Sequence, residues 1–576
     1  MMQATEKAVA ESQLATPALA NVAQFVVEQA SQRPLATAVI EQRTGNKITF
    51  GELAQRVENV AHGLVRLGLC NGARAVLAVR PGIDFVVCVF AMFRAGAVPV
   101  VIDPGMGKAS LLKCIAQAQP DALVGIPLAH ALSLRHRKAF GSINQRVTVG
   151  RRWLWSGPSL AQLQAQSVAG TTIAQTCADD MAAILFTSGA TGAPKGVVYH
   201  HGAFVEQVRM IRDTYGIAAG EVDCACFALF ALFSVAMGVT VVLPDIDFAR
   251  PGAADPARVV AAIRDHKATM AFASPAIWRK VGPWLEANNQ RLETLARVLI
   301  AGAAVPVATL AQLKPRLAPG GEIFTPYGAT ESLPFASISA TEVLGDTCFA
   351  TSDGAGVCVG APLPGVNTRI VHAVEGPIAS IDDVVDCAPG EVGEILVHSA
   401  VTTRQYFMNY DADMRSKIRV DAADGHSRTV SKAPSALWHR MGDTGYLDGK
   451  GRLWYCGRVS HTVWTAQGPL YPEQVEGIFL NHQAVSRCAL VGLGDKGAQQ
   501  AVVVVELHGG LPPGADLKQR IETELLQIAQ AHALTRQVKR VLFHAALPVD
   551  ARHNAKIDRE ALAKWAAAQR SSGSEQ

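Results

Sequence analysis

Ten residues in the first half of the chain combine hydroxyls, glycines and one lysine in a pattern that suits a polyphosphate. They are Thr187-Ser188-Gly189-Ala190-Thr191-Gly192-Ala193-Pro194-Lys195-Gly196. Glycines let the backbone turn its N–H groups toward an anion, hydroxyls add donors, and Lys195 adds a mobile positive charge. The segment departs from the P-loop, which has glycine directly before the lysine, because Pro194 stands there. Read alone, it leaves a flexible surface turn open as the less favoured alternative.

Three further polar clusters follow along the chain. They are 325–331 (TPYGATE), 439–446 (HRMGDTGY), which leads on to Gly457-Arg458, and 548–559 (PVDARHNAKIDR). The first follows Ile323-Phe324 and is predicted to be a tight loop at the end of a strand. The four clusters in this order resemble the core motifs of the adenylate-forming superfamily, which includes acyl-CoA synthetases, luciferases and peptide-synthetase adenylation domains. The resemblance runs from about Asn21 to about Trp565, which is nearly the whole chain.

The resemblance implies that the chain uses ATP and Mg²⁺ to adenylate a carboxylate. The nucleotide-binding residues that it implies are Thr187, Ser188, Gly189, Thr191, Gly192 and Lys195 at the β- and γ-phosphates, Gly302, Ala303 and Tyr327 around the adenine, Thr330 at the α-phosphate, and Asp443 and Arg458 at the ribose. Glu331 would hold Mg²⁺, because a carboxylate is a hard oxygen ligand. Lys556 would be catalytic together with Lys195 and Thr330, reaching the bound carboxylate and α-phosphate when a small C-terminal domain closes.

At three positions the chain departs from the superfamily pattern. Ala190 replaces a usual Ser or Thr, which removes one donor from the phosphate loop, and Ala555 replaces the glycine that usually precedes the catalytic lysine. Ser460 stands where the superfamily has an aspartate or lysine as its hinge. The identity of the hinge residue is therefore left open, whereas Ala555 is a modest steric change that is not expected to abolish function.

The elements expected to position these motifs are short buried strands that alternate with helices. Residues 75–79, 98–102 and 181–186 read as strands, and residues 50–57 as part of a helix. This alternation predicts an α/β fold with layered, largely parallel sheets, followed from about Gly356 by a small β-rich subdomain. Beyond Arg458 we expect helices over 472–480 and 517–531, and strands over 488–492 and 501–505, as in a small mobile α+β C-terminal domain.

The chain is long enough for about three or four compact units, since it has 576 residues. We expect a disordered N-terminus over residues 1–20, a large AMP-binding domain over 21–457, a hinge at 458–461 and a small domain over 462–570. The polar stretch Asp421 to Pro434 is predicted to be a loop.

Charge and cysteine usage exclude several classes of protein. The formal net charge of +4 is small for this length, and the run Arg135-His136-Arg137-Lys138 lacks interleaved aromatics, so we expect a solvated loop rather than a nucleic-acid interface. The 11 cysteines form no CxxC pair, which indicates a reduced, cytoplasmic setting without metal-ligand spacing. The first twenty residues lack a signal-peptide core.

One apolar stretch, Phe227 to Leu243, barely reaches the length needed to span a bilayer. Ser234, Gly238 and Thr240 interrupt it, so we expect a buried helix and strand instead. With residues 272–276 it should line an acyl pocket, which carries no basic residue and therefore suits a fatty or alkyl-chain acid.

Within the superfamily, residues 227–233, 325–331 and 552–557 resemble the bacterial olefin-pathway β-lactone synthetases. These enzymes adenylate a 2-alkyl-3-hydroxy fatty acid, whose own 3-hydroxyl then expels AMP to close a β-lactone. A long-chain acyl-CoA ligase, which uses a CoA thiol in the second step, stays open as an alternative, as does a non-catalytic nucleotide-binding scaffold. The resemblance also leaves open a complex with other enzymes of the pathway.

Overall fold

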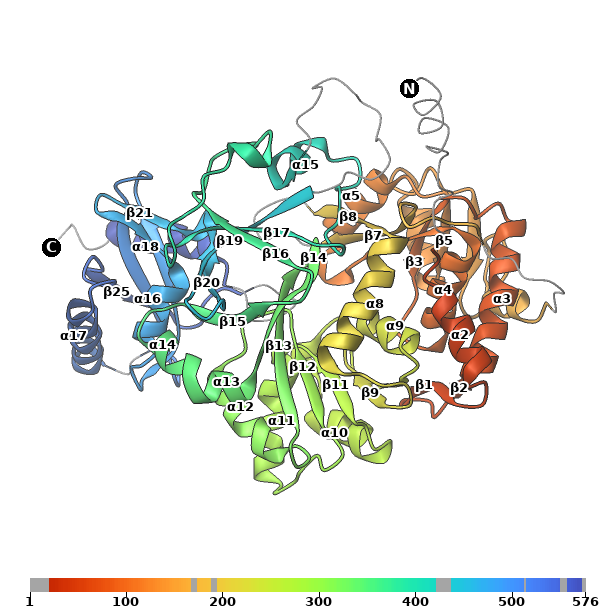
Figure 1. Ribbon diagram of the computed structural model, residues 1–576, viewed down its shortest axis with the longest axis horizontal. Helices are drawn as coiled ribbons and strands as arrows, with labels where there is room; N and C mark the ends of the chain where they lie inside the picture. The colour runs from red at the N-terminus through yellow and green to blue at the C-terminus, as the bar shows by residue number, and fades with distance from the viewer. Residues whose placement is uncertain are drawn as a thin grey trace, which may run out of the picture. The chain divides into compact units, whose positions relative to one another are not determined.

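The computed structural model describes residues 20–166, 174–187, 194–420, 437–511, 514–549 and 557–571. The chain divides into two compact units (Figure 1). The first contains residues up to 36, 49–102 and 109–209, and the second contains residues 37–48, 103–108 and 210 onward. The expected domains 21–457 and 462–570 divide the chain at other positions and stay predictions, as does the hinge at 458–461, where a 3-10 turn spans Val459–His461.

The first unit is built on a six-stranded sheet in the order β6-β5-β3-β4-β7-β8. Its strands are β3 (Arg74–Ala78), β4 (Val98–Ile102), β5 (Ala122–Gly125), β6 (Gln145–Thr148), β7 (Met181–Thr187) and β8 (Lys195–His200). The strands pair in parallel except for β7 and β8. Near-continuous apolar runs in β4 and β7 fit strands that are buried on both faces.

Helices connect the strands of the first unit. They are α2 (Gln24–Gln32), α3 (Phe50–Arg66), α4 (Ile83–Ala95), α5 (Lys108–Ala118), α6 (Pro127–Arg135), α7 (Leu160–Gln164) and α8 (His201–Tyr215), which continues into the second unit. Helix α3 begins at a capping box, in which the side chains of Thr49 and Glu52 each bond the other's backbone N–H. It packs against α4, whose side chains are almost all buried.

The second unit contains a 14-stranded mixed sheet in the order β16-β17-β19-β20-β15-β14-β13-β12-β11-β9-β10-β1-β2, with β18 paired to β19. Figure 1 shows β14, β13, β12, β11 and β9 side by side. The strands are β1 (Thr37–Glu41), β2 (Lys47–Thr49), β9 (Val222–Ala225), β10 (Thr240–Leu243), β11 (Met270–Ala273), β12 (Arg297–Ile300), β13 (Glu322–Ala329), β14 (Ser332–Ser339), β15 (Val357–Pro362), β16 (Asn367–Val371), β17 (Gly393–His398), β18 (Lys417–Arg419), β19 (Leu437–Leu447) and β20 (Leu453–Arg458).

The helices of this part are α9 (Ala228–Ala236), α10 (Pro256–Asp265), α11 (Pro275–Ala287), α12 (Val307–Leu313), α13 (Ala340–Glu342), α14 (Cys348–Ser352) and α15 (Tyr410–Ser416). Proline occupies the first turn of α10 and α11, where its missing N–H costs no hydrogen bond. Trp278 and neighbouring apolar residues of α10, α11 and α12 form a core against β11 and β12.

The C-terminal part of the second unit has a separate three-stranded sheet, β23-β24-β25, and a hairpin, β21-β22. Its elements are β21 (Val463–Thr465), β22 (Gly468–Leu470), α16 (Pro472–Phe479), β23 (Val485–Leu493), β24 (Gln500–Leu507), α17 (Ala515–Ala531), β25 (Arg540–Phe543) and α18 (Arg559–Ser571). The predicted helices and strands of this region are therefore confirmed within a few residues.

Most other predicted elements are also confirmed, and the chain is a layered α/β protein with a β-rich part. The apolar stretch 227–243 forms α9 and β10, and within the described ranges no helix is both long and apolar enough to cross a bilayer. One prediction was wrong: residues 325–329 continue β13 instead of forming a loop, and only Thr330 and Glu331 make the turn to β14. The predicted loop 421–434 and residues 1–19 lie outside the described residues.

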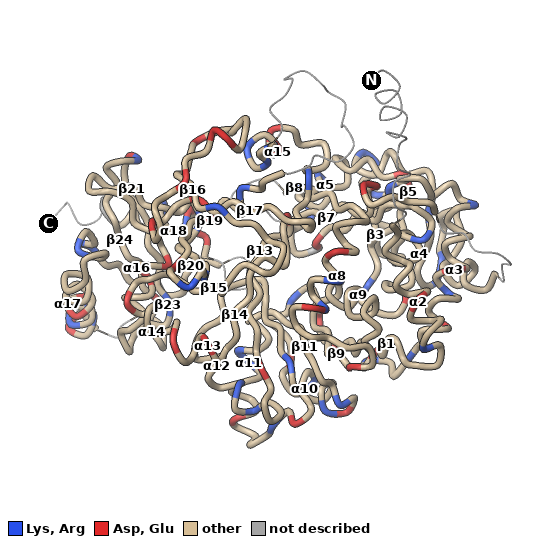
Figure 2. The backbone as a smooth tube through the Cα atoms, viewed as in Figure 1, with Lys and Arg blue, Asp and Glu red and all other residues tan. Residues whose placement is uncertain are grey.

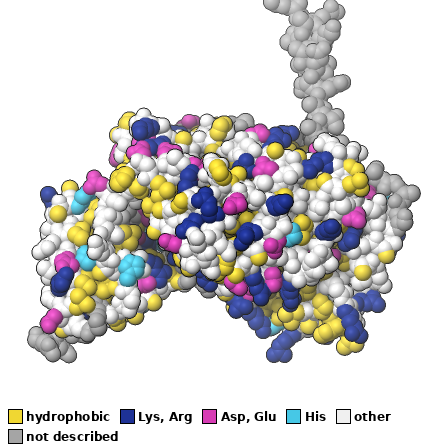
Figure 3. All heavy atoms as spheres, turned by 90° about the horizontal axis from the view of Figure 1, so that it is seen from below, with side chains coloured by type: hydrophobic (Ala, Val, Ile, Leu, Met, Phe, Trp, Pro, Cys, Tyr) yellow, Lys and Arg dark blue, Asp and Glu magenta, His cyan; other side chains and the backbone are white. Residues whose placement is uncertain are grey.

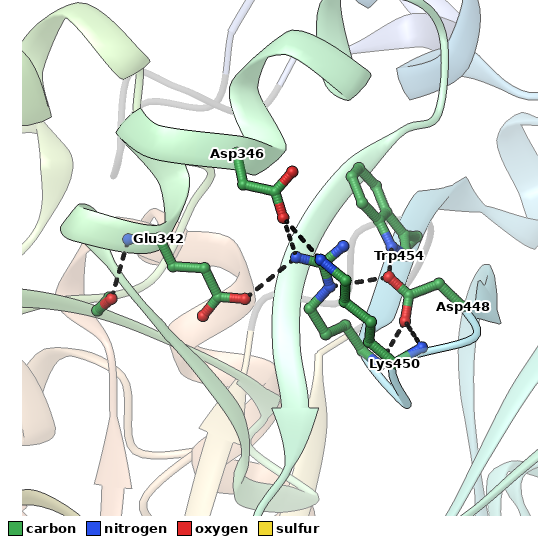
Figure 4. Close-up of polar contacts among 7 residues, drawn as sticks. Glu342, Asp346, Asp448, Lys450 and Trp454 are labelled. Atoms are coloured by element: carbon green, nitrogen blue, oxygen red, sulfur yellow. Dashed lines mark hydrogen bonds and ion pairs between the residues drawn. The ribbon is translucent and has the colours of Figure 1, made fainter.

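Acidic and basic side chains are interspersed along the backbone (Figure 2), and one ion cluster ties the β19–β20 turn to α13 and the segment after it. Arg452 contacts Asp448 at 2.8 Å, Asp346 at 2.7 Å and Glu342 at 3.3 Å. Figure 4 shows Glu342, Asp346 and Asp448 converging from separate segments, with the Trp454 indole donating to Asp448. The cluster stabilises this part of the β-rich region.

Candidate active site

Asp443 and Arg458 form an ion pair between adjacent strands, in which the carboxylate is buried and the arginine side chain is 34% exposed. They are register partners in β19 and β20, and the Nη1 of Arg458 donates to Oδ1 of Asp443 at 2.7 Å and to the Met441 carbonyl at 3.1 Å. Asp443 is only 6% exposed. Burial alone would lower the pKa of Arg458, but the Asp443 carboxylate outweighs it and raises that pKa, so the guanidinium stays charged.

The pair leaves hydrogen-bonding capacity unused. The buried Nε of Arg458 meets no acceptor among the described residues. Gly442, in the left-handed region at φ +64°, lies against the guanidinium, which a Cβ would approach to 3.3 Å. A buried N–H without an acceptor costs free energy unless a ligand supplies one. Together with the Asp443 carboxylate, this donor fits the hydroxyls of a ribose.

Tyr327, which ends the straight part of β13, donates its hydroxyl to the second oxygen of Asp443 at 2.5 Å. Its ring lies against Phe335 and Tyr455, with centroids 5.4 and 6.0 Å away. Burial, reinforced by the negative charge of Asp443, raises the pKa of Tyr327 well above its ordinary value. The hydroxyl therefore stays protonated and fixes the carboxylate in one orientation.

Glu331 lies in the turn between β13 and β14 and is held from two sides. The Tyr406 hydroxyl donates to Oε1 of Glu331 at 2.6 Å, and the Thr403 backbone N–H donates to the Glu331 carbonyl at 2.7 Å. Burial first, and then the Glu331 charge, raises the pKa of Tyr406, which keeps it a donor. The arrangement fixes a half-buried carboxylate, as a magnesium ligand requires. Thr330 is its neighbour in the same turn.

The residues of the predicted phosphate loop that the structure describes lie in the first unit. Thr187 ends β7 and Lys195 opens β8 directly opposite it. The intervening site residues Ser188, Gly189, Thr191 and Gly192 lie outside the described residues, and so does Lys556. In the second unit, Gly302 and Ala303 form a bend after β12, and Gly302 has a φ of +103°.

The two segments predicted to line the acyl pocket come together in the second unit. Phe230 of α9 stacks on Phe272 of β11 with ring centroids 4.0 Å apart, and the Phe227 ring lies 5.9 Å from Phe272. A buried polar pair joins the same helix to β9: the Ser234 hydroxyl donates to the Asp223 carboxylate at 2.7 Å. Burial raises the pKa of Asp223 to about 7. This pair ties α9 to β9 and has no counterpart in the sequence prediction.

Sequence reasoning also missed residues that hold the predicted ones. Tyr406 lies 75 positions from Glu331, and no local pattern marks it. Arg559 ends the C-terminal motif, and the sequence predicts no role for it. Its guanidinium forms an ion pair with Glu476 of α16 at 2.5 and 3.0 Å. The sequence offered one signal for this pair: Glu476 stands among the apolar residues of α16, and a buried carboxylate needs a charged or hydrogen-bonding partner.

Comparison with known proteins identifies the family of the chain. The family model for AMP-binding enzymes matches residues 26–407. An olefin β-lactone synthetase from Xanthomonas campestris pv. campestris is 45% identical over 524 residues, covering 91% of each chain. A second olefin β-lactone synthetase, from Stenotrophomonas maltophilia, is 43% identical and covers 95% of this chain and 98% of its own.

Solved structures share the fold at lower identity. An anthranilate CoA ligase in complex with anthranoyl-AMP superposes with a TM-score of 0.77 at 19% identity, covering 96% of this chain and 99% of its own. An o-succinylbenzoate CoA synthetase from Bacillus subtilis, in complex with ATP and magnesium ion, gives a TM-score of 0.70 at 23% identity, covering 93% and 98%. The chain therefore belongs to the AMP-binding enzyme family.

Proposed function

We propose that this protein adenylates a 2-alkyl-3-hydroxy fatty acid with ATP and then closes it to a β-lactone, releasing pyrophosphate and AMP. The observation that carries the proposal is identity of 43–45% over nearly the whole chain to two olefin β-lactone synthetases. The buried Asp443–Arg458–Tyr327 cluster supports it, because its free acceptor and donor capacity suits a ribose.

In the first step a carboxylate oxygen of the acid attacks the α-phosphorus of ATP, and the bond to the pyrophosphate oxygen breaks. We assign Thr330 to the α-phosphate and Lys195, with Thr187, Ser188, Gly189, Thr191 and Gly192, to the β- and γ-phosphates. Glu331 would hold Mg²⁺, which neutralises phosphate charge when bound. Lys556 would stabilise the negative charge that develops as carboxylate and α-phosphate meet.

In the second step the 3-hydroxyl oxygen of the substrate attacks its own acyl carbon. A carbon–oxygen bond forms, the bond to AMP breaks with its electron pair leaving on AMP, and the hydroxyl proton is lost. Because the nucleophile is tethered, its effective concentration is high and no second carrier is needed. The stacked Phe230 and Phe272 offer an apolar surface to the alkyl chains.

The second candidate is an acyl-CoA ligase, which shares the first step. It is favoured by a 4-chlorobenzoate–CoA ligase from Arthrobacter that is 26% identical over 84% of this chain. Incubating the protein with ATP, Mg²⁺ and a 2-alkyl-3-hydroxy acid, with and without CoA, separates the two by NMR of the products. A β-lactone without CoA is expected. A thioester formed only with CoA would support the ligase, and no AMP with any acid would support a non-catalytic scaffold.

Lys556→Ala tests the assignment of the adenylation step. We expect acyl-adenylate formation to fall while ATP binding, followed by calorimetry, stays near the wild-type value. An unchanged rate of adenylation would show that Lys556 is wrongly assigned.

We also place the protein in the cytoplasm. All eleven cysteines are among the described residues and are free thiols, seven of them buried, which suits a reducing compartment.

A further inference from the structure

A loop and a helix of the first unit, which one buried contact joins, each expose apolar side chains. The loop follows β6, and its Trp155 is buried, stacks on His130 of α6 at 5.0 Å and donates to the Thr148 hydroxyl at 2.7 Å. In this loop, Leu154 is 99% and Trp153 is 62% exposed, and on α6 Leu128 is 71% exposed.

The exposure of Trp153 and Leu154 is fixed by the packing of the loop. The Arg152 guanidinium donates to the Gly157 carbonyl at 2.6 Å, which closes the loop on itself. Gly157, at φ +99°, leaves no room for a side chain, because a Cβ would lie 2.1 Å from the Arg146 carbonyl oxygen. The Trp153 ring lies 5.9 Å from the buried Trp155 ring. Trp153 and Leu154 are therefore exposed on a loop whose backbone is held by its own hydrogen bonds and packing.

The same segment is strongly basic. Between Asp121 and Asp179 the sequence contains no acidic residue, while its cations are Arg135, Arg137, Lys138, Arg146, Arg151 and Arg152. All of these except Arg146 are exposed. The basic run 135–138 had been expected to be only a solvated loop because it lacks aromatics in sequence. The fold brings aromatic residues to this run, because the His130–Trp155 contact joins α6 to the loop that contains Trp153 and Trp155.

We propose that this face, formed by Leu128, Leu134, Arg135, Arg137, Lys138 and residues 151–154, docks the protein reversibly on an anionic lipid surface. Exposed Trp and Leu within a ring of Lys and Arg are the features of proteins that lie in the interface of a membrane. On the face of the molecule in Figure 3, hydrophobic side chains lie among Lys, Arg, Asp and Glu.

The positive charge of this face is complementary to an anionic lipid surface. This docking goes beyond the proposed function and does not depend on it. Leu35 serves as a control for the loss of an exposed hydrophobic side chain, because it is 88% exposed in the first unit but lies outside this segment. Arg43 and Lys47 offer a matched pair of exposed cations in the β1–β2 hairpin.

The test is co-sedimentation of the full chain with vesicles of phosphatidylcholine alone and of phosphatidylcholine with about one third phosphatidylglycerol. We expect binding to the anionic vesicles only. Trp153→Ser with Leu154→Ser should lower the partition coefficient about tenfold or more, and Arg151→Gln with Arg152→Gln about tenfold. Leu35→Ser and the pair Arg43→Gln with Lys47→Gln should change it less than twofold.

Several results would overturn the proposal. They are no binding to either vesicle, equal binding to both, or binding unchanged by the Trp153 and Leu154 substitutions. A change in oligomeric state caused by those substitutions, without a change in vesicle binding, would show a protein interface instead. Stronger binding to a DNA duplex than to anionic vesicles would show a nucleic-acid interface. Thermal unfolding and acid-dependent AMP release of each variant report its folding, since no substituted residue belongs to the proposed active site.

Discussion

Two arginine–aspartate pairs on the β19–β20 hairpin are built in opposite ways. Arg452 is surrounded by three carboxylates, and the Trp454 indole also donates to Asp448. Arg458 pairs with Asp443 alone, and its buried Nε has no acceptor among the described residues. The first pair is saturated by the protein itself, whereas the second keeps capacity for a ligand. The same two residue types on one hairpin thus serve stability in one place and, in our proposal, ribose binding in the other.

The largest expected effect is on Asp443→Asn, which keeps the shape of the side chain but removes its charge. Loss of charge-assisted hydrogen bonds to the ribose should cost about 3 kcal/mol, so ATP–pyrophosphate exchange should fall about 100-fold. Asp448→Asn is the matched control on the same hairpin and should leave exchange within about twofold. Equal losses in both variants would erase the distinction between the pairs.

Arg452→Gln tests the other side of the comparison. Removing the shared cation leaves Asp448, which is mostly buried, beside two further carboxylates, and the free energy of unfolding should fall by about 2 kcal/mol. Urea unfolding measures this change. Arg212→Gln, which breaks an exposed pair with Asp213, should cost less than about 0.5 kcal/mol. If the two variants were equally stable, the Arg452 cluster would have no structural role.

Arg458→Lys sharpens the binding role of the second pair. Lysine keeps the charge opposite Asp443 but loses the planar fork and its Nε donor, so kcat/KM for ATP should fall about tenfold, or about 1.4 kcal/mol. Steady-state kinetics with varied ATP measure this loss. A wild-type value would mean that the unpartnered Nε does not reach the nucleotide.

The smallest effect concerns acid stability. Burial alone would raise the pKa of Asp448, but hydrogen bonds from Trp454 and Arg452 outweigh it and lower that pKa to about 2. A carboxyl with a lowered folded-state pKa stabilises the fold above its unfolded value, near 3.9, and loses that contribution as the pH falls toward 2. The difference in unfolding free energy between wild type and Asp448→Asn should therefore shrink by about 1 kcal/mol from pH 5 to pH 3. A difference independent of pH would contradict this.

Local patterns predicted most elements and failed where pairing with another strand overrides local preference. The strand 98–102 was predicted at its observed bounds, and the apolar stretch 227–243 was correctly divided into helix and strand. The segment 325–329 was mistaken for a loop because glycine, proline and threonine are typical of turns. Its pairing with β14 holds it extended, which tertiary context can impose on residues of weak strand preference.

The sequence by itself determined the order of apolar runs and polar motifs, and through them the α/β class and the resemblance to adenylate-forming enzymes. Among the described site residues it also identified Tyr327, Asp443 and Arg458, which the structure joins by hydrogen bonds. Only the tertiary structure decided that Tyr406 holds Glu331, that Arg452 gathers three acids, and that Trp155 packs on His130. Such contacts join residues on different elements, and strand register and crossovers, which have no local signature, bring them together.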